Sequence, residues 1–171
     1  KPRHSPLRVF VEAAELARTA RAHAERGETA LAKLLHRQWL EREPDAIEPL
    51  GYLGRLALMA NEIGQSIELL ERATVLRPDE PNILQDLGIA YRRAQKLDQA
   101  TTTLCRAIKI DPTQRRSRLH LGAIQESQGK VHDALVNYFS AVSSAQGKGL
   151  WRSRGTTPPA LLAMVEHAIT F

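Results

Sequence analysis

The feature that most constrains the fold is a step of 34 residues that recurs along the chain. It separates the prolines Pro44, Pro78 and Pro112, each of which follows a segment with apolar residues at helical intervals. The same step joins small and apolar residues in four further columns: Ala20, Gly54, Gly88 and Gly122; Leu53, Leu87 and Leu121; Ala32, Ser66, Ala100 and Ala134; Ala73, Ala107 and Ala141. Agreement of independent columns on one period indicates an array of repeated units.

Each unit is predicted to be a helix-turn-helix. In "ILQDLGIAYRRA", residues 83–94, apolar side chains recur at helical intervals, and Gly88 leaves room where a second helix crosses. Gly27 and Gly129 fall in short turns, where they suit the left-handed conformation that often ends a helix. The proline closes the unit because it cannot continue a helix. The expected helices cover about 4–27, 28–42, 46–60, 64–76, 80–94, 97–110, 114–128 and 131–145.

The composition agrees with an all-α protein that needs no disulfide. The apolar residues are mostly Leu and Ala, which favour helices, and aromatic residues make up 5% of the chain. Cys105 is the single cysteine, so the fold depends on neither an internal disulfide nor a Cys-rich zinc site, and the cytoplasm is the expected compartment. No apolar run approaches the roughly 18 residues that cross a bilayer, so we expect no membrane partner.

The repeated unit resembles the tetratricopeptide repeat, which has the same 34-residue period. The third unit carries the resemblance best, through Leu84, Leu87, Gly88, Tyr91, Ala100, Leu104, Ala107 and Pro112. The resemblance implies a right-handed α-α superhelix of about four helix pairs plus a C-terminal capping helix. We expect a repeat domain over residues 1–146, with repeats at about 13–46, 47–80, 81–114 and 115–146. A linker at 147–157 and the capping helix at 158–171 follow.

The C-terminal segment "AQGKGLWRSRGTTPPALLAMVEHAITF" has a second resemblance, carried by Trp151, Pro158, Pro159 and the helix after them. It is similar to the junction in bacterial proteins related to aspartyl/asparaginyl β-hydroxylases. In such proteins the repeats precede a catalytic domain that depends on Fe(II) and 2-oxoglutarate. The resemblance implies that this chain is a non-catalytic, substrate-presenting or regulatory arm that ends before the catalytic domain.

No pattern in the chain indicates catalysis or a cofactor. His23 and Glu25 imitate part of an iron-binding motif, but residues two apart on a helix point in nearly opposite directions and cannot share a metal. Cys105 has no nearby histidine in the sequence and is expected to be an inert thiol. We therefore expect no catalytic residue, no metal and no cofactor in this chain.

A binding surface is the better interpretation, because the first helix of every unit should line the concave face of the superhelix. The residues expected there are Arg21, Arg55, Met59, Gln85, Ile89, Arg92, Arg93, Arg116, His120 and Glu126. Several arginines on one face favour a protein or peptide partner with acidic groups, since guanidinium groups pair well with carboxylates. The alternative is that these arginines simply lie on solvent-exposed helix faces and have no binding role. Sparse basic and aromatic residues disfavour nucleic acid as a partner.

Two specialised kinds of tetratricopeptide groove can be tested on the residues. Binders of chaperone tails use a clamp of Lys, Asn and Arg, but the matching places here hold Gly51, Arg55, Asp86, Arg116 and His120. The sugar-transferase superhelix has an Asn before each Leu-Gly, whereas this chain has Arg18, Tyr52, Asp86 and His120 there. Neither the clamp nor the asparagine ladder is expected.

Overall fold

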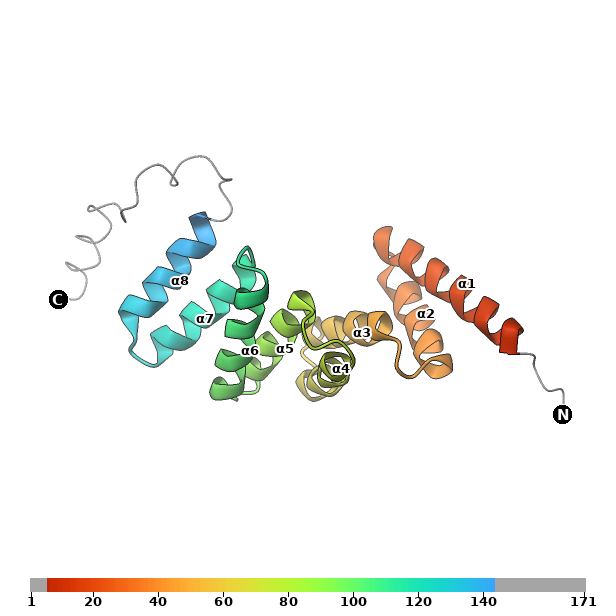
Figure 1. The fold of residues 1–171 in the computed structure, drawn as a ribbon, viewed down its shortest axis with the longest axis horizontal. Coiled ribbons are helices and arrows are strands. Elements are labelled where there is room, and N and C mark those ends of the chain that lie inside the picture. Colours follow the sequence, from red (N-terminus) through yellow and green to blue (C-terminus); the bar gives the residue numbers. More distant parts are fainter. Residues whose placement is uncertain (1–5, 144–171) are drawn as a thin grey trace.

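The computed structural model describes residues 6–143, which form helices joined by short turns (Figure 1). The helices are α1 (Pro6–Glu25), α2 (Thr29–Arg42), α3 (Ile47–Met59), α4 (Ile63–Leu76), α5 (Pro81–Arg93), α6 (Leu97–Ile110), α7 (Arg115–Ser127) and α8 (Val131–Ser143). They pack as four helix pairs in chain order, and no strand occurs among the described residues. The all-α class and the stack of helix pairs are confirmed. The expected linker and capping helix, 147–171, lie outside the described residues.

The turn inside each pair places one residue in the left-handed conformation, again every 34 residues. The residues and their φ angles are Gly27 at 74°, Asn61 at 61°, Gln95 at 60° and Gly129 at 73°. In the third pair the N–H of Lys96, just after this residue, donates to the carbonyl of Tyr91 at 2.9 Å, which satisfies a carbonyl at the helix end. The role predicted for the two glycines is confirmed, and two non-glycine residues share it.

Close crossing of the two helices of a pair explains the constant step between glycines. In three pairs a glycine of the first helix faces a large side chain sixteen residues later: Gly54 faces Leu70, Gly88 faces Leu104 and Gly122 faces Tyr138. A Cβ atom added to any of these glycines would lie 2.7 Å from that side chain, which is too close for a real contact. The first pair has Ala20 and His36 in the corresponding places, and both are buried.

The core runs without a break from one pair to the next. Its main cluster extends from Leu50 in α3 to Ile124 in α7. The small residues predicted for the second helices are all buried: Ala32, Ser66, Ala100 and Ala134. The Ser66 hydroxyl donates to the carbonyl of Gly54 at 2.9 Å, so the polar member of this column is satisfied. A continuous core of this kind is what stacked repeats require.

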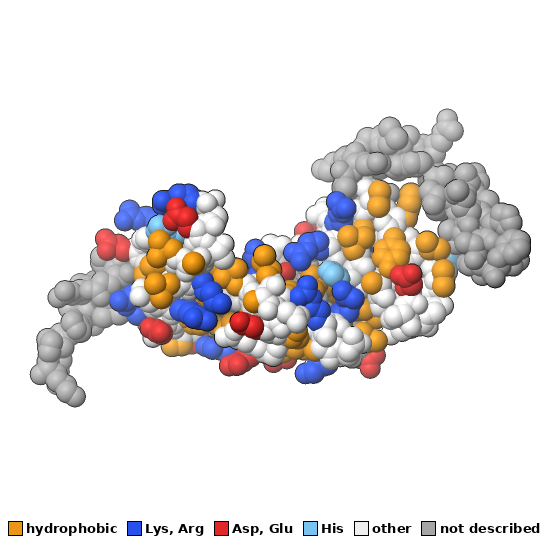
Figure 2. All heavy atoms as spheres, turned by 180° about the vertical axis from the view of Figure 1, so that it is seen from behind, with side chains coloured by type: hydrophobic (Ala, Val, Ile, Leu, Met, Phe, Trp, Pro, Cys, Tyr) orange, Lys and Arg blue, Asp and Glu red, His pale blue; other side chains and the backbone are white. Residues whose placement is uncertain are grey.

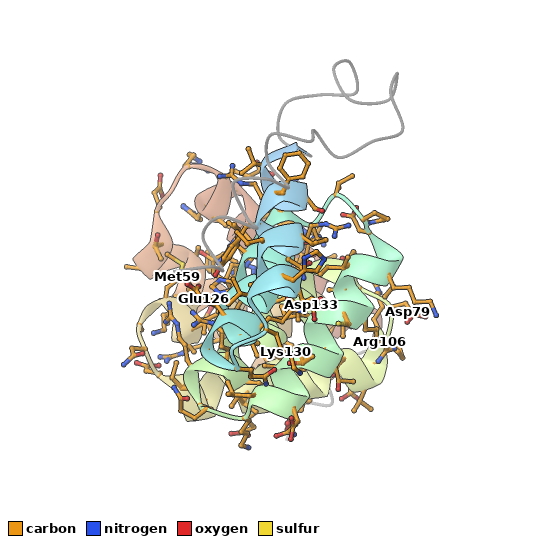
Figure 3. The ribbon with its side chains drawn as sticks, turned by 90° about the vertical axis from the view of Figure 1, so that its left-hand side faces the viewer. Met59, Asp79, Arg106, Glu126, Lys130 and Asp133 are labelled. Atoms are coloured by element: carbon orange, nitrogen blue, oxygen red, sulfur yellow. The ribbon has the colours of Figure 1, made fainter. Side chains whose placement is uncertain are left out.

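Successive pairs are joined through two sets of contacts. The second helix of each pair packs on the first helix of the next, and among the first helices α3 packs on α5 and α5 packs on α7. Pro44, Pro78 and Pro112 lie in the connections between pairs, as predicted. Viewed along the stack, Met59 and Glu126 of the first helices lie on one side, and the Arg106–Asp79 ion pair lies on the other (Figure 3). We call the side lined by α1, α3, α5 and α7 the inner face.

Candidate functional site

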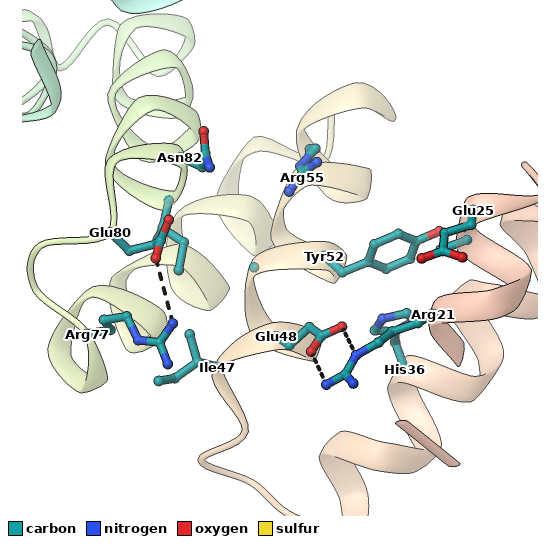
Figure 4. A pocket seen from close by; sticks show the side chains of 13 residues that line it. Arg21, Glu25, His36, Ile47, Glu48, Tyr52, Arg55, Arg77, Glu80 and Asn82 are labelled. Atoms are coloured by element: carbon teal, nitrogen blue, oxygen red, sulfur yellow. Dashed lines mark hydrogen bonds and ion pairs between the residues drawn. The ribbon is translucent and has the colours of Figure 1, made fainter. Parts of the chain in front are cut away.

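The inner face carries a pocket of about 500 Å³ near its N-terminal end. The first helices α1, α3 and α5 supply most of its walls, and His36 of α2 and the α4–α5 connection complete them (Figure 4). Seen from behind the view of Figure 1, the molecule is hollowed between its first and last pairs, and Lys and Arg side chains gather near the middle (Figure 2). A volume of this size falls in the usual range of ligand pockets, roughly 300–1,000 Å³.

One wall of the pocket is held by an ion pair between the first two repeats. The Nε and Nη2 atoms of Arg21 donate to the two carboxylate oxygens of Glu48 at 2.7 and 2.6 Å. The guanidinium carbon of Arg21 also lies 5.6 Å from the ring centre of Trp39, within range of a cation-π contact. Arg21 is therefore engaged with its own chain, which the sequence alone did not reveal.

Aromatic rings beneath this ion pair fix the junction of α2 and α3. The His36 ring is stacked on Tyr52, with centroids 4.0 Å apart and an angle of 15° between the planes. The Nδ1 atom of His36 lies 2.8 Å from the carbonyl of Ala32, so Nδ1 carries the proton and donates. Burial lowers the pKa of His36, which favours the neutral ring. This histidine is thus a core residue that forms part of the pocket wall.

A buried acid lies in the middle of the inner face. Asp86 of α5 is 3% exposed, and its Oδ2 accepts a hydrogen bond from Nε of Arg55 at 3.1 Å. Its Oδ1 makes no hydrogen bond with the described residues, and Nη1 of Arg116 lies 3.9 Å away. Burial raises the pKa of the Asp86 carboxyl, and Arg55 and Arg116 oppose that effect. Asp86 was not among the residues expected in the groove; it was noted only as departing from the clamp and as the residue before Leu-Gly where an asparagine ladder would have its Asn.

Towards the C-terminal end, arginines surround a half-buried histidine. We call Arg92 and Arg93 of α5 with Arg116 and His120 of α7 the basic cluster. Burial and the nearby charges of Arg92, Arg116 and Arg93 lower the pKa of His120 to about 4. Arg93 donates to the carbonyl of Leu58 at 2.6 Å, while Nε of Arg92 is buried and makes no hydrogen bond within the described part of the chain. The cluster therefore combines positive charge with unused donors.

The remaining residues expected in the groove divide into exposed and buried ones. Met59 is 74% exposed, and Glu126 is exposed and accepts a hydrogen bond from the Tyr138 hydroxyl at 2.7 Å. The expectation for Ile89 was wrong, because Ile89 is 1% exposed and packs with Leu58 in the core. Gln85 is also buried, at 8% exposed, so it offers little surface to a partner.

Neither a metal-binding group of side chains nor a membrane-spanning helix occurs among residues 6–143. No group of three or more His, Cys, Asp and Glu side chains in this range could hold a metal ion. Among the same residues, no helix has the length and apolar character to cross a bilayer. Cys105 is exposed, and partial burial raises the pKa of its thiol.

Comparison with known proteins found relatives of low identity, and no family model matches the chain. The chain is 26% identical over 120 residues to the mouse protein O-mannosyl-transferase TMTC1, covering 68% of this chain and 13% of the relative. It is 25% identical over 104 residues to the bovine BBSome complex member BBS4, covering 60% of this chain and 20% of the relative. For the peroxisomal targeting signal receptor of Eremothecium gossypii the values are 26% over 134 residues, with 74% and 23% covered. The chain thus spans less than a quarter of each of these relatives.

Solved structures with a similar fold superpose on most of this chain. MamA from Desulfovibrio magneticus superposes with a TM-score of 0.70 at 17% identity, covering 81% of this chain and 78% of that one. An O-GlcNAc transferase from Thermobaculum terrenum superposes with a TM-score of 0.61 at 24% identity, covering 69% of this chain and 23% of the transferase. At these identities the likeness concerns the fold.

The resemblance to β-hydroxylase-type proteins gains no support from these relatives. Its residues, Trp151, Pro158 and Pro159, lie outside the described part of the chain. The resemblance to the tetratricopeptide repeat is different, because TMTC1, BBS4, the peroxisomal receptor and MamA all contain that repeat. Helix pairs with a 34-residue period and glycine-mediated crossings match the same architecture. The chain is a tetratricopeptide-repeat superhelix.

Proposed function

We propose that this chain is a polypeptide-binding module that holds an acidic segment of a partner protein on its inner face. The observation that carries the proposal is the uneven charge of that face. Near the pocket, Arg21 is neutralised by Glu48 and Arg55 is bonded to Asp86. In the basic cluster, the charges of three arginines lower the pKa of His120. The carboxylate that faces Arg116 belongs to Asp86, which is already bonded to Arg55, so the cluster keeps a net positive charge.

The donors of the basic cluster are suited to a carboxylate or phosphate of a partner. Arg116 lies beyond hydrogen-bond distance of Asp86, at 3.9 Å, and Arg92 has a buried Nε without an acceptor among the described residues. Bonds between guanidinium groups and oxyanions are among the strongest hydrogen bonds in proteins. A partner with acidic residues therefore fits this region.

We propose binding and not catalysis as the activity of this chain, without a cofactor. Two of the similar proteins carry the names of transferases, but the chain matches 13% of TMTC1 and 23% of the O-GlcNAc transferase. The matched region has the repeat fold, and that fold hosts many functions. We propose the cytoplasm as the compartment, since a chain with one cysteine suits reducing conditions.

The test uses fluorescent peptides rich in Glu and matched peptides in which Gln replaces Glu. The wild-type chain should bind the Glu peptides more tightly. Arg92→Glu with Arg116→Glu should weaken that binding by about tenfold or more, because two charge-assisted contacts become repulsive. The matched control, Arg37→Glu with Lys109→Glu, makes the same charge change on exposed residues of α2 and α6 and should bind as the wild type does. Equal affinity for both peptides, or equal losses in both variants, would refute the proposal.

A further inference from the structure

Gly51 differs from the glycines at the helix crossings. A Cβ atom at Gly54, Gly88 or Gly122 would collide with a neighbour, so packing explains those three. At Gly51 the nearest atom to such a Cβ would be Cγ1 of Ile83 at 3.6 Å, which is an ordinary contact. A glycine inside a helix costs about 1 kcal/mol relative to alanine, and packing in α3 does not require it here. Another reason for the glycine is therefore needed.

Gly51 lies in the wall of the inner-face pocket, where a missing side chain enlarges the space. The side chain nearest to the missing Cβ is that of Ile83, and Ile47, one turn earlier on α3, also lines the pocket, whereas the Tyr52 side chain points toward α1 (Figure 4). Any side chain longer than alanine at this position would extend into the 500 Å³ pocket. The absence of a side chain at Gly51 leaves an apolar recess open on the inner face.

The three arginines around this recess are each paired with a carboxylate, and Glu25, which also lines the pocket, acts on Arg21 through its charge. Arg21 is bonded to Glu48, and Nη1 of Arg77 lies 3.7 Å from the carboxylate of Glu80 (Figure 4). Arg55, on the next turn of α3, is held by Asp86. A charged occupant would have to compete with these pairs, whereas an uncharged one would not. The recess is therefore complementary to a neutral, apolar group.

We propose that the recess at Gly51 is a specificity subsite that receives one large apolar or aromatic side chain of the bound polypeptide. This inference rests on the proposed function, because the same polypeptide places its acidic residues against the basic cluster. Asp86, which contacts arginines from both regions, lies between the two subsites. The bound segment thus has a neutral anchor at one end and an acidic part at the other. The partly exposed Ile47 and the space left by Gly51 in front of the buried Ile83 select the anchor.

The test fills the recess from two helices and compares the result with a matched glycine elsewhere. Gly51→Leu fills it from α3, and Asn82→Trp, at an exposed residue of α5, fills it from the rim. The control is Gly64→Leu, because Gly64 lies in α4 and no neighbouring atom lies within 4 Å of the place where its Cβ would stand. Melting curves of all three variants establish that each folds. Gly51→Ala should raise the melting temperature by a few degrees, as expected where packing does not need a glycine.

The probe is a library of random displayed peptides selected on the full chain. We expect the selected peptides to share one large apolar residue near a group of acidic residues. A synthetic peptide of that sequence should lose about tenfold or more in affinity for Gly51→Leu and for Asn82→Trp, and none for Gly64→Leu. Replacing its apolar residue by Ala should weaken binding to the wild type and leave binding to Gly51→Leu unchanged.

Other outcomes separate this inference from the proposed function. Selected peptides that are acidic without an apolar position, or that bind Gly51→Leu as tightly as the wild type, would overturn the subsite and leave the acidic groove standing. Competition by a synthetic peptide of residues 144–171 would assign the recess to the chain itself and overturn a partner as its occupant. A library from which nothing is enriched would overturn both proposals.

Discussion

Gly88 and Leu104 approach so closely that a Cβ atom on Gly88 would lie 2.7 Å from Cδ2 of Leu104. Both residues are buried, and Leu104 is completely so. The crossing of α5 and α6 therefore depends on a small residue on one helix and a large residue on the other. The glycines recur every 34 residues because the same crossing occurs in successive repeats.

Substitution of Gly88 by Ala should lower the free energy of unfolding by about 1–3 kcal/mol, because the added methyl group overfills the crossing. Urea unfolding followed by circular dichroism measures the change. Gly64→Ala is the control and should be neutral or stabilising by up to about 1 kcal/mol, since space is open at Gly64. If the two substitutions cost the same, the crossing does not set the requirement for glycine.

A double-mutant cycle should show that Gly88 and Leu104 are coupled. Leu104→Ala alone should cost about 2–5 kcal/mol through the cavity that it leaves. Combined with Gly88→Ala, the loss should be smaller than the sum of the single losses, because each substitution relieves part of the effect of the other. Additive losses would contradict direct contact between the two sites.

Replacement of Gln95 by Gly should stabilise the chain. Gln95 has a φ of 60°, a region that costs a residue with a Cβ atom about 1–2 kcal/mol. Part of the gain is lost to the greater freedom of glycine in the unfolded chain, so we expect about 0.5–1 kcal/mol, or a rise of about 1–4 °C in melting temperature. Gly129→Gln, at the equivalent turn, should change stability in the opposite direction.

Asp86 should make the stability of the wild type depend on pH in an unusual direction. Burial raises its pKa in the folded chain, so the folded state keeps this proton to higher pH than the unfolded state does. The contribution of Asp86 to stability is then present at pH below about 4 and decreases as pH rises through the folded pKa. Urea unfolding of wild type and of Asp86→Asn across this range gives the difference. A difference that grows with pH would contradict a raised pKa.

His120 should titrate far below an ordinary histidine. Its pKa of about 4 means that the ring stays neutral in the folded chain while it is protonated in the unfolded chain below about pH 6.5. The corresponding stability is present above about pH 6.5 and is lost as pH falls towards 4. The ring proton signals in an NMR titration give the midpoint directly. Arg92→Ala should move it upward, whereas Lys109→Ala should leave it in place, and a wild-type midpoint near 6.5 would refute the clustering of charge.

The sequence predicted the helices and their crossings because the residues that form them recur at the same positions in each repeat. Gly54, Gly88 and Gly122 are three copies of one local requirement, and comparison of the copies reveals it. The charge pairs of the inner face have no such repetition. Glu48 follows Arg21 by 27 residues and Asp86 follows Arg55 by 31, so each pair joins neighbouring repeats and depends on how these are stacked.

The burial of Ile89 is a second feature that the sequence alone did not predict. The earlier repeats have Arg21 and Arg55 at this position and the last repeat has Ala123, so the column alone does not show whether residue 89 faces solvent or the core. In α5 the residue turns towards Leu58 and becomes part of the core. The change from arginine in the first two repeats to an apolar residue in the last two was the available signal. It could not be interpreted without the geometry between α3 and α5.

The polar contacts between repeats have a kinetic consequence. The hydrogen bond from Arg93 to the carbonyl of Leu58 joins two repeats, yet it spans only 35 positions of sequence. No long loop has to close before such contacts form, and chains with low contact order fold quickly. Folding can begin in any helix pair and propagate to its neighbours, as in a one-dimensional lattice. Damage to one pair should therefore loosen the adjoining pairs first, and each end of the array should open before its centre.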